Sequence, residues 1–198
     1  NITSIDSDKK YQLNIYQVNY NPQKSNANLK TDPIFELNSN YSNMHPSFDS
    51  ESGWLYFSSD RPGGYGGMDL YRVRFSEAGV AGEPENMGND INTPSDEVFP
   101  FSYGEDVLFF SSNRKLGLGK LDPIMATRVI DNRWSIEALG APFSSENDDF
   151  GFYLDSKTKL GFISSNRDEG KGKDDNYYFV SKPKVKGLDD KYFFGLDT

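Results

Sequence analysis

The sequence predicts an all-β protein built from repeated units of four short antiparallel strands, and three observations carry this prediction. The motif S-S-[DN]-R-x-x-G-x-G-x-x-D occurs three times, starting at Ser58, Ser111 and Ser164, so that successive copies are 53 residues apart. Short apolar runs flank every copy. Aromatic residues make up 15% of the chain, beside 18 glycines and 10 prolines, which is typical of short strands joined by many turns. A fixed period of this kind indicates a repeat architecture.

The apolar runs predict one strand before the motif and one after it. The preceding runs, at 54–57, 107–110 and 160–163, are rich in aromatic and aliphatic residues and too short for a helix. The following runs lie at 70–73, 124–127 and 177–180. Further strands are expected at 44–48, 97–101 and 149–153, where the units open, and at 133–137, where the second unit closes. An outer strand is expected at 32–37, after a polar loop at 21–30, and a linker at 83–94 precedes the second unit. The motif is therefore a connection between two strands of one unit.

The residue types of the motif indicate a structural role in each unit. Glycines at the two fixed positions are expected to supply positive φ angles. The Asp or Asn after the serine pair tolerates a left-handed conformation and caps a turn. The repeated positions are Ser58, Asp60, Arg61, Gly64, Gly66 and Asp69, then Ser111, Asn113, Arg114, Gly117, Gly119 and Asp122, and finally Ser164, Asn166, Arg167, Gly170, Gly172 and Asp175.

The motif arginine and aspartate are eight residues apart in every copy, as in Arg114 and Asp122. A hairpin would bring such positions together, so we predict that each arginine pairs with the aspartate of its own motif. An anion site or a catalytic carboxylate is the alternative interpretation. Because a catalytic group is needed once and not in every repeat, the motif is interpreted as a repeated clamp on a loop.

Composition and charge narrow the function. The 198 residues carry a formal net charge of −9, which argues against nucleic acid and anionic membrane surfaces as partners. The chain has no cysteine, which excludes disulfides, thiolate metal sites and cysteine nucleophiles. No apolar run is long enough to span a bilayer and no signal peptide is recognisable, so we expect a soluble chain without direct membrane insertion.

The period divides the chain into about three and a half units. The expected boundaries are 1–43 for a partial unit, then 44–96, 97–148, and 149–198 with a C-terminal extension, all within one domain. Four short strands in about fifty residues are typical of one blade of a β-propeller. Propellers usually need four to eight blades, so we expect part of a larger propeller. A compact ring of four blades is the alternative.

Residues 58–71 and 97–114, with the linker at 91–94, resemble the TolB-like, WD40-like propeller repeats of OmpA-family envelope proteins. The resemblance covers roughly residues 11–181. It implies a periplasmic, outer-membrane-associated and non-enzymatic scaffold, linked to type IX secretion or to an OmpA-like cell-wall anchor. Lys120 and Lys173 replace a glycine of the pattern, and residues 183–198 match nothing in it. Peptidoglycan would be bound only through a module that is not in this chain.

The candidate binding residues lie where the first strand of each unit begins. Asn43, Glu97 and Asp149 occupy this position and could form an acidic ring at the mouth of a propeller channel, which would favour a basic protein or peptide. Alternatively, they cap the strand starts through loop hydrogen bonds. His45, the only histidine, is expected to be a packed strand residue rather than a ligand, although it is counted among the mouth candidates.

No sequence feature predicts catalysis, a cofactor or a metal site. The motifs G-x-S-x-G and H-E-x-x-H and the Walker glycine loop are all missing. Carboxylates cluster at 148–149 and 174–176, but their spacing matches no calcium loop. A sugar-active propeller enzyme is the second function class. Inward convergence of the three motif arginines would favour that enzyme, whereas pairing within each unit would favour a scaffold.

Overall fold

A computed structural model describes residues 3–5, 11–18, 20, 31–34, 37, 40–130, 132–168, 170–181 and 194–196, and these residues contain strands and connections but no helix. The protein is therefore all-β, as predicted, in the part that the structure describes. The expected polar loop at 21–30 lies outside the described residues. No helix in the described part is long and apolar enough to cross a membrane.

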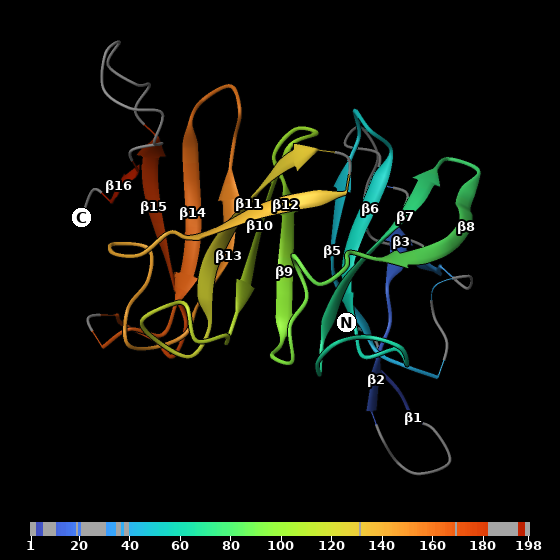
Figure 1. The fold of residues 1–198 in the computed structure, drawn as a ribbon, viewed down its shortest axis with the longest axis horizontal. Helices are drawn as coiled ribbons and strands as arrows, with labels where there is room; N and C mark the ends of the chain where they lie inside the picture. The colour runs from blue at the N-terminus through green and yellow to red at the C-terminus, as the bar shows by residue number, and fades with distance from the viewer. Residues whose placement is uncertain are drawn as a thin grey trace.

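Three four-stranded antiparallel sheets form the body of the molecule (Figure 1). In each sheet the strands follow one another in sequence order, because every connection joins neighbouring strands. The first sheet contains β5 (Asn43–Asp49), β6 (Trp54–Ser59), β7 (Asp69–Ser76) and β8 (Gly79–Asn86). The second contains β9 (Glu97–Ser102), β10 (Val107–Ser112), β11 (Asp122–Ile130) and β12 (Arg133–Ala138). The third contains β13 (Asp149–Leu154), β14 (Leu160–Ser165), β15 (Asp175–Ser181) and β16 (Phe194–Leu196).

Two smaller sheets precede these three. β1 (Thr3–Ile5) pairs with β2 (Tyr11–Leu13), and β3 (Tyr16–Val18) pairs with β4 (Thr31–Pro33). The sequence predicted one outer strand at 32–37, but β4 ends at Pro33, and of the remaining positions Ile34 and Leu37 are buried while 35 and 36 lie outside the described residues. The predicted linker at 83–94 is also corrected, because its first four residues belong to β8.

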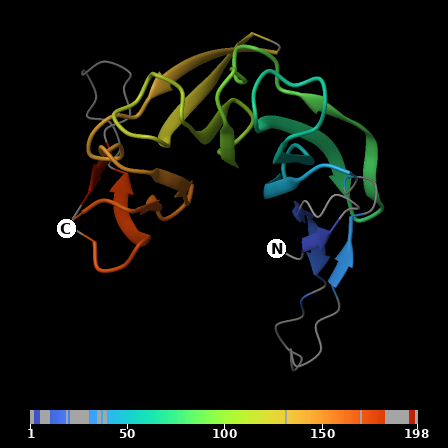
Figure 2. The same cartoon turned by 90° about the horizontal axis from the view of Figure 1, so that it is seen from below.

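The three large sheets follow one another around an arc, with the first strand of each on the concave side (Figure 2). β9 lies between β5 and β13 and contacts both. The outer strands β8 and β12 lie on the convex side, and the small N-terminal sheets and the third large sheet lie on the two arms of the arc (Figure 2). The arc places equivalent turns of successive sheets side by side.

Apolar cores fill the spaces between neighbouring sheets. We call the face that turns toward the following sheet the trailing face, and the opposite one the leading face. Tyr56 and Leu70 on the trailing face of the first sheet pack with Leu108 and Phe110 on the leading face of the second. Strand alternation puts Phe109 on the other side, where it packs against the third sheet. Each fully buried Phe contributes about 1.5–3 kcal/mol, so these cores bind the sheets together.

The leading face of the first sheet is covered as well. Leu55, Phe57 and Tyr71 pack there against Ile15 and Ile34 of the N-terminal segment. The two small sheets thus take the place that a preceding sheet would occupy.

Each first strand carries a β-bulge at the same position. The pairing with the second strand shifts between Met44 and Ser47, and equivalent shifts occur in β9 and β13. His45, Phe99 and Gly151 have φ angles of 52°, 53° and 67° at these bulges. Bulges bend a strand and increase its twist. The repeat therefore conserves a bend that brings aromatic rings of adjacent strands together.

Candidate functional site

The motif forms the connection between the second and third strand of each large sheet, as predicted. The Asp69 carboxylate accepts hydrogen bonds from the amides of Tyr65 and Gly66, at 2.5 and 3.1 Å. Asp122 accepts one from Gly119, and Asp175 accepts one from Gly172. The motif aspartate therefore fixes the conformation of its own loop by accepting hydrogen bonds from the loop amides, and it is not the partner of the arginine.

The predicted role of the glycines is wrong. None of the six fixed glycines has a positive φ angle; Gly63, directly before the fixed Gly64, does. A Cβ at Gly64, Gly117 or Gly170 would instead overlap the motif aspartate, and one at Gly66 or Gly119 would overlap carbonyl oxygens of the following linker. These five glycines are needed because other atoms come too close to their backbone.

The predicted pairing of the motif arginine is also wrong. The Nη2 atom of Arg114 lies 2.9 Å from Oε1 of Glu97, and that of Arg167 lies 2.6 Å from Oδ1 of Asp149. Arg61 donates to Oδ1 of Asn43 at 2.8 Å. Each arginine also donates through Nε to the second serine of its own motif. The arginines thus tie each motif loop to the start of the first strand in the same sheet.

The partners of the arginines are the candidate binding residues predicted at the starts of the first strands. Asn43, Glu97 and Asp149 each begin a first strand and have no exposed surface. Glu97 accepts further hydrogen bonds from the Thr93 amide and hydroxyl and from Ser112, and Asp149 accepts from the Ser145 amide and hydroxyl. These are the loop hydrogen bonds of the alternative interpretation. A partner could not touch these side chains in this arrangement.

Burial has an electrostatic consequence for Glu97. Removal from water raises the pKa of its carboxyl, while hydrogen bonds from Thr93 and the charge of Arg114 act in the opposite direction. A buried carboxylate of this kind depends on its arginine, because a charge without a partner is costly in a protein interior.

His45 is a packed residue, as predicted. Its ring stacks on Phe99 with a centroid distance of 3.7 Å, and its Nδ1 accepts a hydrogen bond from the Phe99 amide. Phe99 stacks in turn on Phe150 at 5.0 Å. Burial lowers the pKa of His45 to about 4, so the ring is neutral near pH 7. The three first strands therefore share a column of stacked rings on the concave side.

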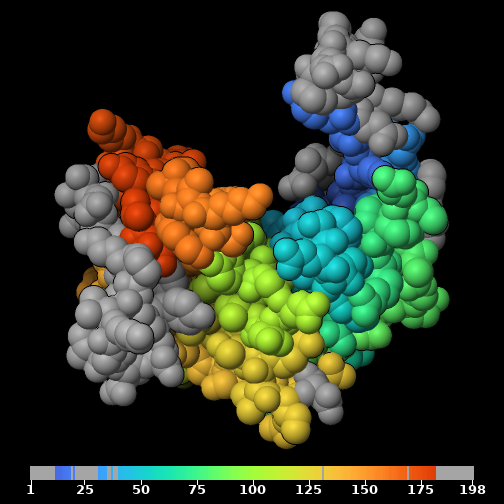
Figure 3. All heavy atoms as spheres, turned by 90° about the horizontal axis from the view of Figure 1, so that it is seen from above, coloured from blue at the N-terminus to red at the C-terminus, as the bar shows by residue number. Residues whose placement is uncertain are grey.

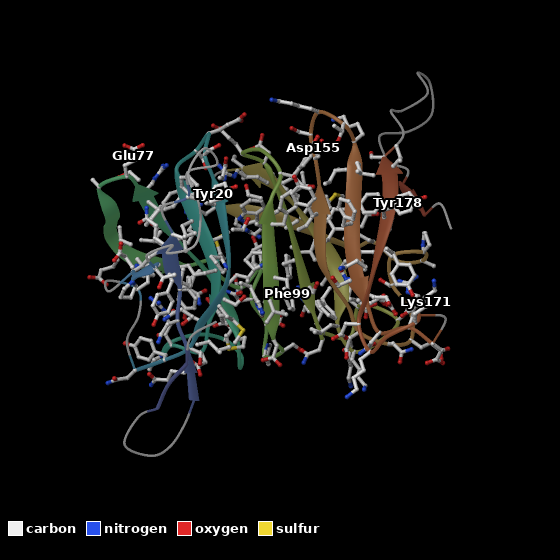
Figure 4. The ribbon with its side chains drawn as sticks, turned by 180° about the vertical axis from the view of Figure 1, so that it is seen from behind. Tyr20, Glu77, Phe99, Asp155, Lys171 and Tyr178 are labelled. Atoms are coloured by element: carbon white, nitrogen blue, oxygen red, sulfur yellow. The ribbon has the colours of Figure 1, made fainter. Side chains whose placement is uncertain are left out.

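The opposite end of the first strands holds a pocket that the sequence analysis missed. Figure 4 places Asp155 at this end and Lys171, in a motif loop, at the other. The turns after β5, β9 and β13 meet there, and Figure 3 views the molecule from this side. The pocket measures about 360 Å³. Its lining residues are Phe48, Asp49, Ser50, Glu51, Phe101, Ser102, Tyr103, Gly104, Tyr153, Leu154, Asp155 and Ser156. We call it the mouth pocket.

Aromatic rings form the walls of the mouth pocket. Phe48 and Tyr153 are 49% and 43% exposed, which is high for such large side chains. The Tyr153 ring lies 5.0 Å from that of Phe101. Phe101 and Tyr153 occupy equivalent positions, because they pair with Phe109 and Phe162, whereas Phe48 lies one residue beyond the equivalent position, Ser47. An aromatic residue near the end of each first strand was the signal in the sequence that could have located the pocket.

Carboxylates dominate the rim of the mouth pocket. The segments 49–53, 103–106 and 155–159 contain five acidic residues and two lysines. One of the carboxylates, Asp106, lies 3.8 Å from Arg128, and Lys159 donates to the Tyr103 hydroxyl. Burial alone would raise the pKa of Asp49, but hydrogen bonds from Ser52, Glu51 and Ser102 lower it. Hydrogen bonds from Thr158 lower the pKa of Asp155. Both groups are therefore charged at neutral pH.

The described residues hold no group of three or more His, Cys, Asp or Glu side chains that could bind a metal ion. Of the two carboxylate clusters, Asp148 is engaged with the Leu121 amide and with Asn166. No protein-family model matches the sequence, and a comparison with curated proteins gives no significant match. The function must therefore be argued from the geometry.

Proposed function

We propose that the three large sheets are consecutive blades of a β-propeller and that the chain is a non-enzymatic scaffold that binds a basic protein segment at the mouth pocket. The order of strands in each sheet, with first strands side by side on the concave side of the arc, supports the propeller. The residues 1–43 would belong to a partial preceding blade. The ring would be larger than the part present in this chain.

The arginine geometry is the observation that favours a scaffold over a sugar-active enzyme. Arg61, Arg114 and Arg167 pair within their own sheets and do not converge on one point. Catalysis requires groups that break the repeat symmetry, whereas the arginine, the aspartate and the second serine of each motif copy support a loop or a strand start. The charged side chains of the motif therefore stabilise the loops and strand starts of their own sheets.

The mouth pocket suits a cationic side chain for two reasons. Its excess of carboxylates attracts positive charge, and its exposed rings can contact a guanidinium or ammonium group through their faces. Interactions between partly exposed charges weaken as salt is added, so binding of this kind is salt-dependent. A neutral or acidic peptide lacks both attractions.

The cellular setting belongs to the same proposal and rests only on the sequence resemblance. It would place the scaffold in the periplasm, attached to an outer-membrane complex of the type IX or OmpA-linked kind, with other envelope proteins as partners. Fractionation of cells that express the complete gene tests this part. Recovery in the cytoplasmic fraction would refute it.

The binding proposal is tested with labelled hexa-arginine and hexa-glutamate peptides by fluorescence anisotropy. We expect binding of hexa-arginine only, weakened roughly two- to fivefold by Asp155→Asn and further by Tyr153→Ala. Glu137→Gln on the outer strand β12 removes the same charge elsewhere and serves as the control. Equal loss in the control would show that only net charge matters. Turnover in a parallel glycan-hydrolysis screen would overturn the scaffold.

A further inference from the structure

The trailing faces of the three large sheets differ in one respect. Tyr56 in the first sheet and Phe109 in the second occupy equivalent positions, and both are 2% exposed because the following sheet covers them. Phe162 occupies this position in the third sheet and is 42% exposed. The same repeat position is thus covered twice and open once.

Phe162 belongs to a contiguous apolar surface. Its strand partners are Tyr153 on β13 and Tyr178 on β15, so the three side chains form a row across the sheet. Tyr178 is 51% exposed, and Val180 lies two residues further along β15, on the same face. Tyr178 is labelled on the third sheet in Figure 4. We call Tyr153, Phe162, Tyr178 and Val180 the open face. Clusters of exposed large apolar side chains commonly mark interaction surfaces.

The motif loops give a second, independent observation. In the first two sheets the following linker lies against the second fixed glycine, where a Cβ at Gly66 or Gly119 would overlap its carbonyl oxygens. The first residue of the following sheet also donates to this loop, from the Glu97 amide to the Met68 carbonyl and from the Asp149 amide to the Leu121 carbonyl, both at 2.7 Å. At Gly172 the nearest atoms to a Cβ belong to the same loop, at 3.5 Å and beyond. The third loop has the glycine that admits a linker, but among the described residues no linker lies against it.

We propose that the open face is the docking surface for a further four-stranded sheet of this repeat, carried on the same polypeptide. This inference rests on the proposed propeller and names the partner of its third sheet. The partner sheet would present an apolar leading face, as the second sheet does with Leu108 and Phe110. The first residue of its first strand would donate an amide to the loop carbonyl of Asp174, the position equivalent to Met68 and Leu121.

A second copy of this chain does not fit the open face in the same way. The complementary surface would be the leading face of its first sheet, around Leu55 and Phe57. Ile15, Ile34 and Leu37 of the same copy already cover that surface. The sheet-to-sheet interface therefore continues only with a further repeat.

The absence of cysteine from the sequence allows a direct test. Phe162→Cys introduces a single thiol on the open face, and its reaction rate with a thiol reagent reports exposure. Val129→Cys, at a position that is 68% exposed, is the accessible control, and Phe109→Cys is the buried control. Each variant is prepared in the 198-residue chain and in an extended chain, in which residues 87–148 are repeated after residue 198 as a surrogate next sheet.

We expect the Phe162→Cys thiol to react about as fast as Val129→Cys in the 198-residue chain and at least about tenfold more slowly in the extended chain. An unchanged rate in the extended chain would overturn the proposal. Protection already in the 198-residue chain would overturn it as well, with sedimentation distinguishing a dimer from cover by the chain itself. Because Tyr153 belongs to both surfaces, peptide binding at the mouth pocket is measured in the 198-residue chain, where no further sheet is present, and failure here is therefore distinguishable from failure of the binding proposal.

Discussion

The second and third large sheets share one repeat, one bulge and one motif, yet they differ in what covers their trailing faces. Phe109 packs with Phe152 at a centroid distance of 4.3 Å, whereas Phe162 faces outward. The local sequences give no reason for this difference, since both residues lie two positions before the serine pair of the motif. Burial in a repeat protein is thus decided by the neighbouring repeat and not by the strand itself.

Truncation of Phe109 and of Phe162 should give the biggest difference in the free energy of unfolding. Phe109→Ala should lower the free energy of unfolding by about 3–5 kcal/mol, because it removes a buried ring and leaves a cavity. Phe162→Ala should lower it by less than about 1 kcal/mol, because much of that ring is already in water. Urea unfolding of both variants measures the difference. Equal losses would mean that the open face is covered in solution.

The second and third sheets should lose similar stability when their motif arginine is removed, because the partner of each arginine lies within the same sheet and not in the following one. Arg114→Ala and Arg167→Ala should each cost about 2–4 kcal/mol, since Glu97 and Asp149 would be left buried without a cation. Lysine should rescue only in part, because it lacks the planar fork of arginine. Arg61→Ala should cost less, since Asn43 is neutral. Thermal unfolding of Arg114→Ala at the wild-type midpoint would contradict this account.

The second and third sheets should differ again at the second fixed glycine of the motif, which is Gly119 in one and Gly172 in the other. Gly119→Ala is expected to cost about 1–3 kcal/mol, because its Cβ would overlap linker carbonyls that are backbone atoms. Gly172→Ala meets only ordinary contacts and should be close to neutral. Calorimetry on the 198-residue chain compares the two. In a chain extended by a further sheet, Gly172→Ala should become costly as well.

At the bulge the first sheet has His45 where the second has Phe99, and only the histidine can titrate. The predicted change in stability is the weakest of the four. His45 has a pKa lowered to about 4 by burial, so the folded state binds fewer protons than the unfolded state between about pH 4 and 6.5. Its contribution to stability is present above this window and is lost as the pH falls through it. We expect about 1 kcal/mol, given the partial exposure of the ring. His45→Asn tolerates the positive φ and cannot titrate; an unchanged pH profile of its urea midpoint would refute the role of His45.

Much of the secondary structure could be predicted because the signals are local. The aromatic and aliphatic runs and the glycine-rich connections identify strands whose pairing is between neighbours in sequence. The partner of each arginine could not be predicted in this way. Asp122, eight residues after Arg114, seemed accessible across a hairpin, but Glu97 lies 17 residues before it and becomes adjacent only when the first strand pairs with the second.

The candidate site was harder still to predict. Asn43, Glu97 and Asp149 were predicted at a channel mouth from their place before each strand, and burial at that place could not be read from one sequence. The mouth pocket lies at the far end of the same strands and combines three turns that are about fifty residues apart. An aromatic residue near the end of each first strand was visible in the sequence, but the meeting of the turns depends on how the sheets pack.

The open face also describes a moment in the synthesis of the protein. A ribosome completes the first sheet before the second, so the surface around Tyr56 must wait in water until the next 53 residues have been added. At about 5–20 residues per second that interval is roughly 3–10 s. The surface around Phe109 then passes through the same interval. Each nascent trailing face is therefore an aromatic surface open to chaperones and to neighbouring nascent chains, and the growing protein is protected only one repeat at a time.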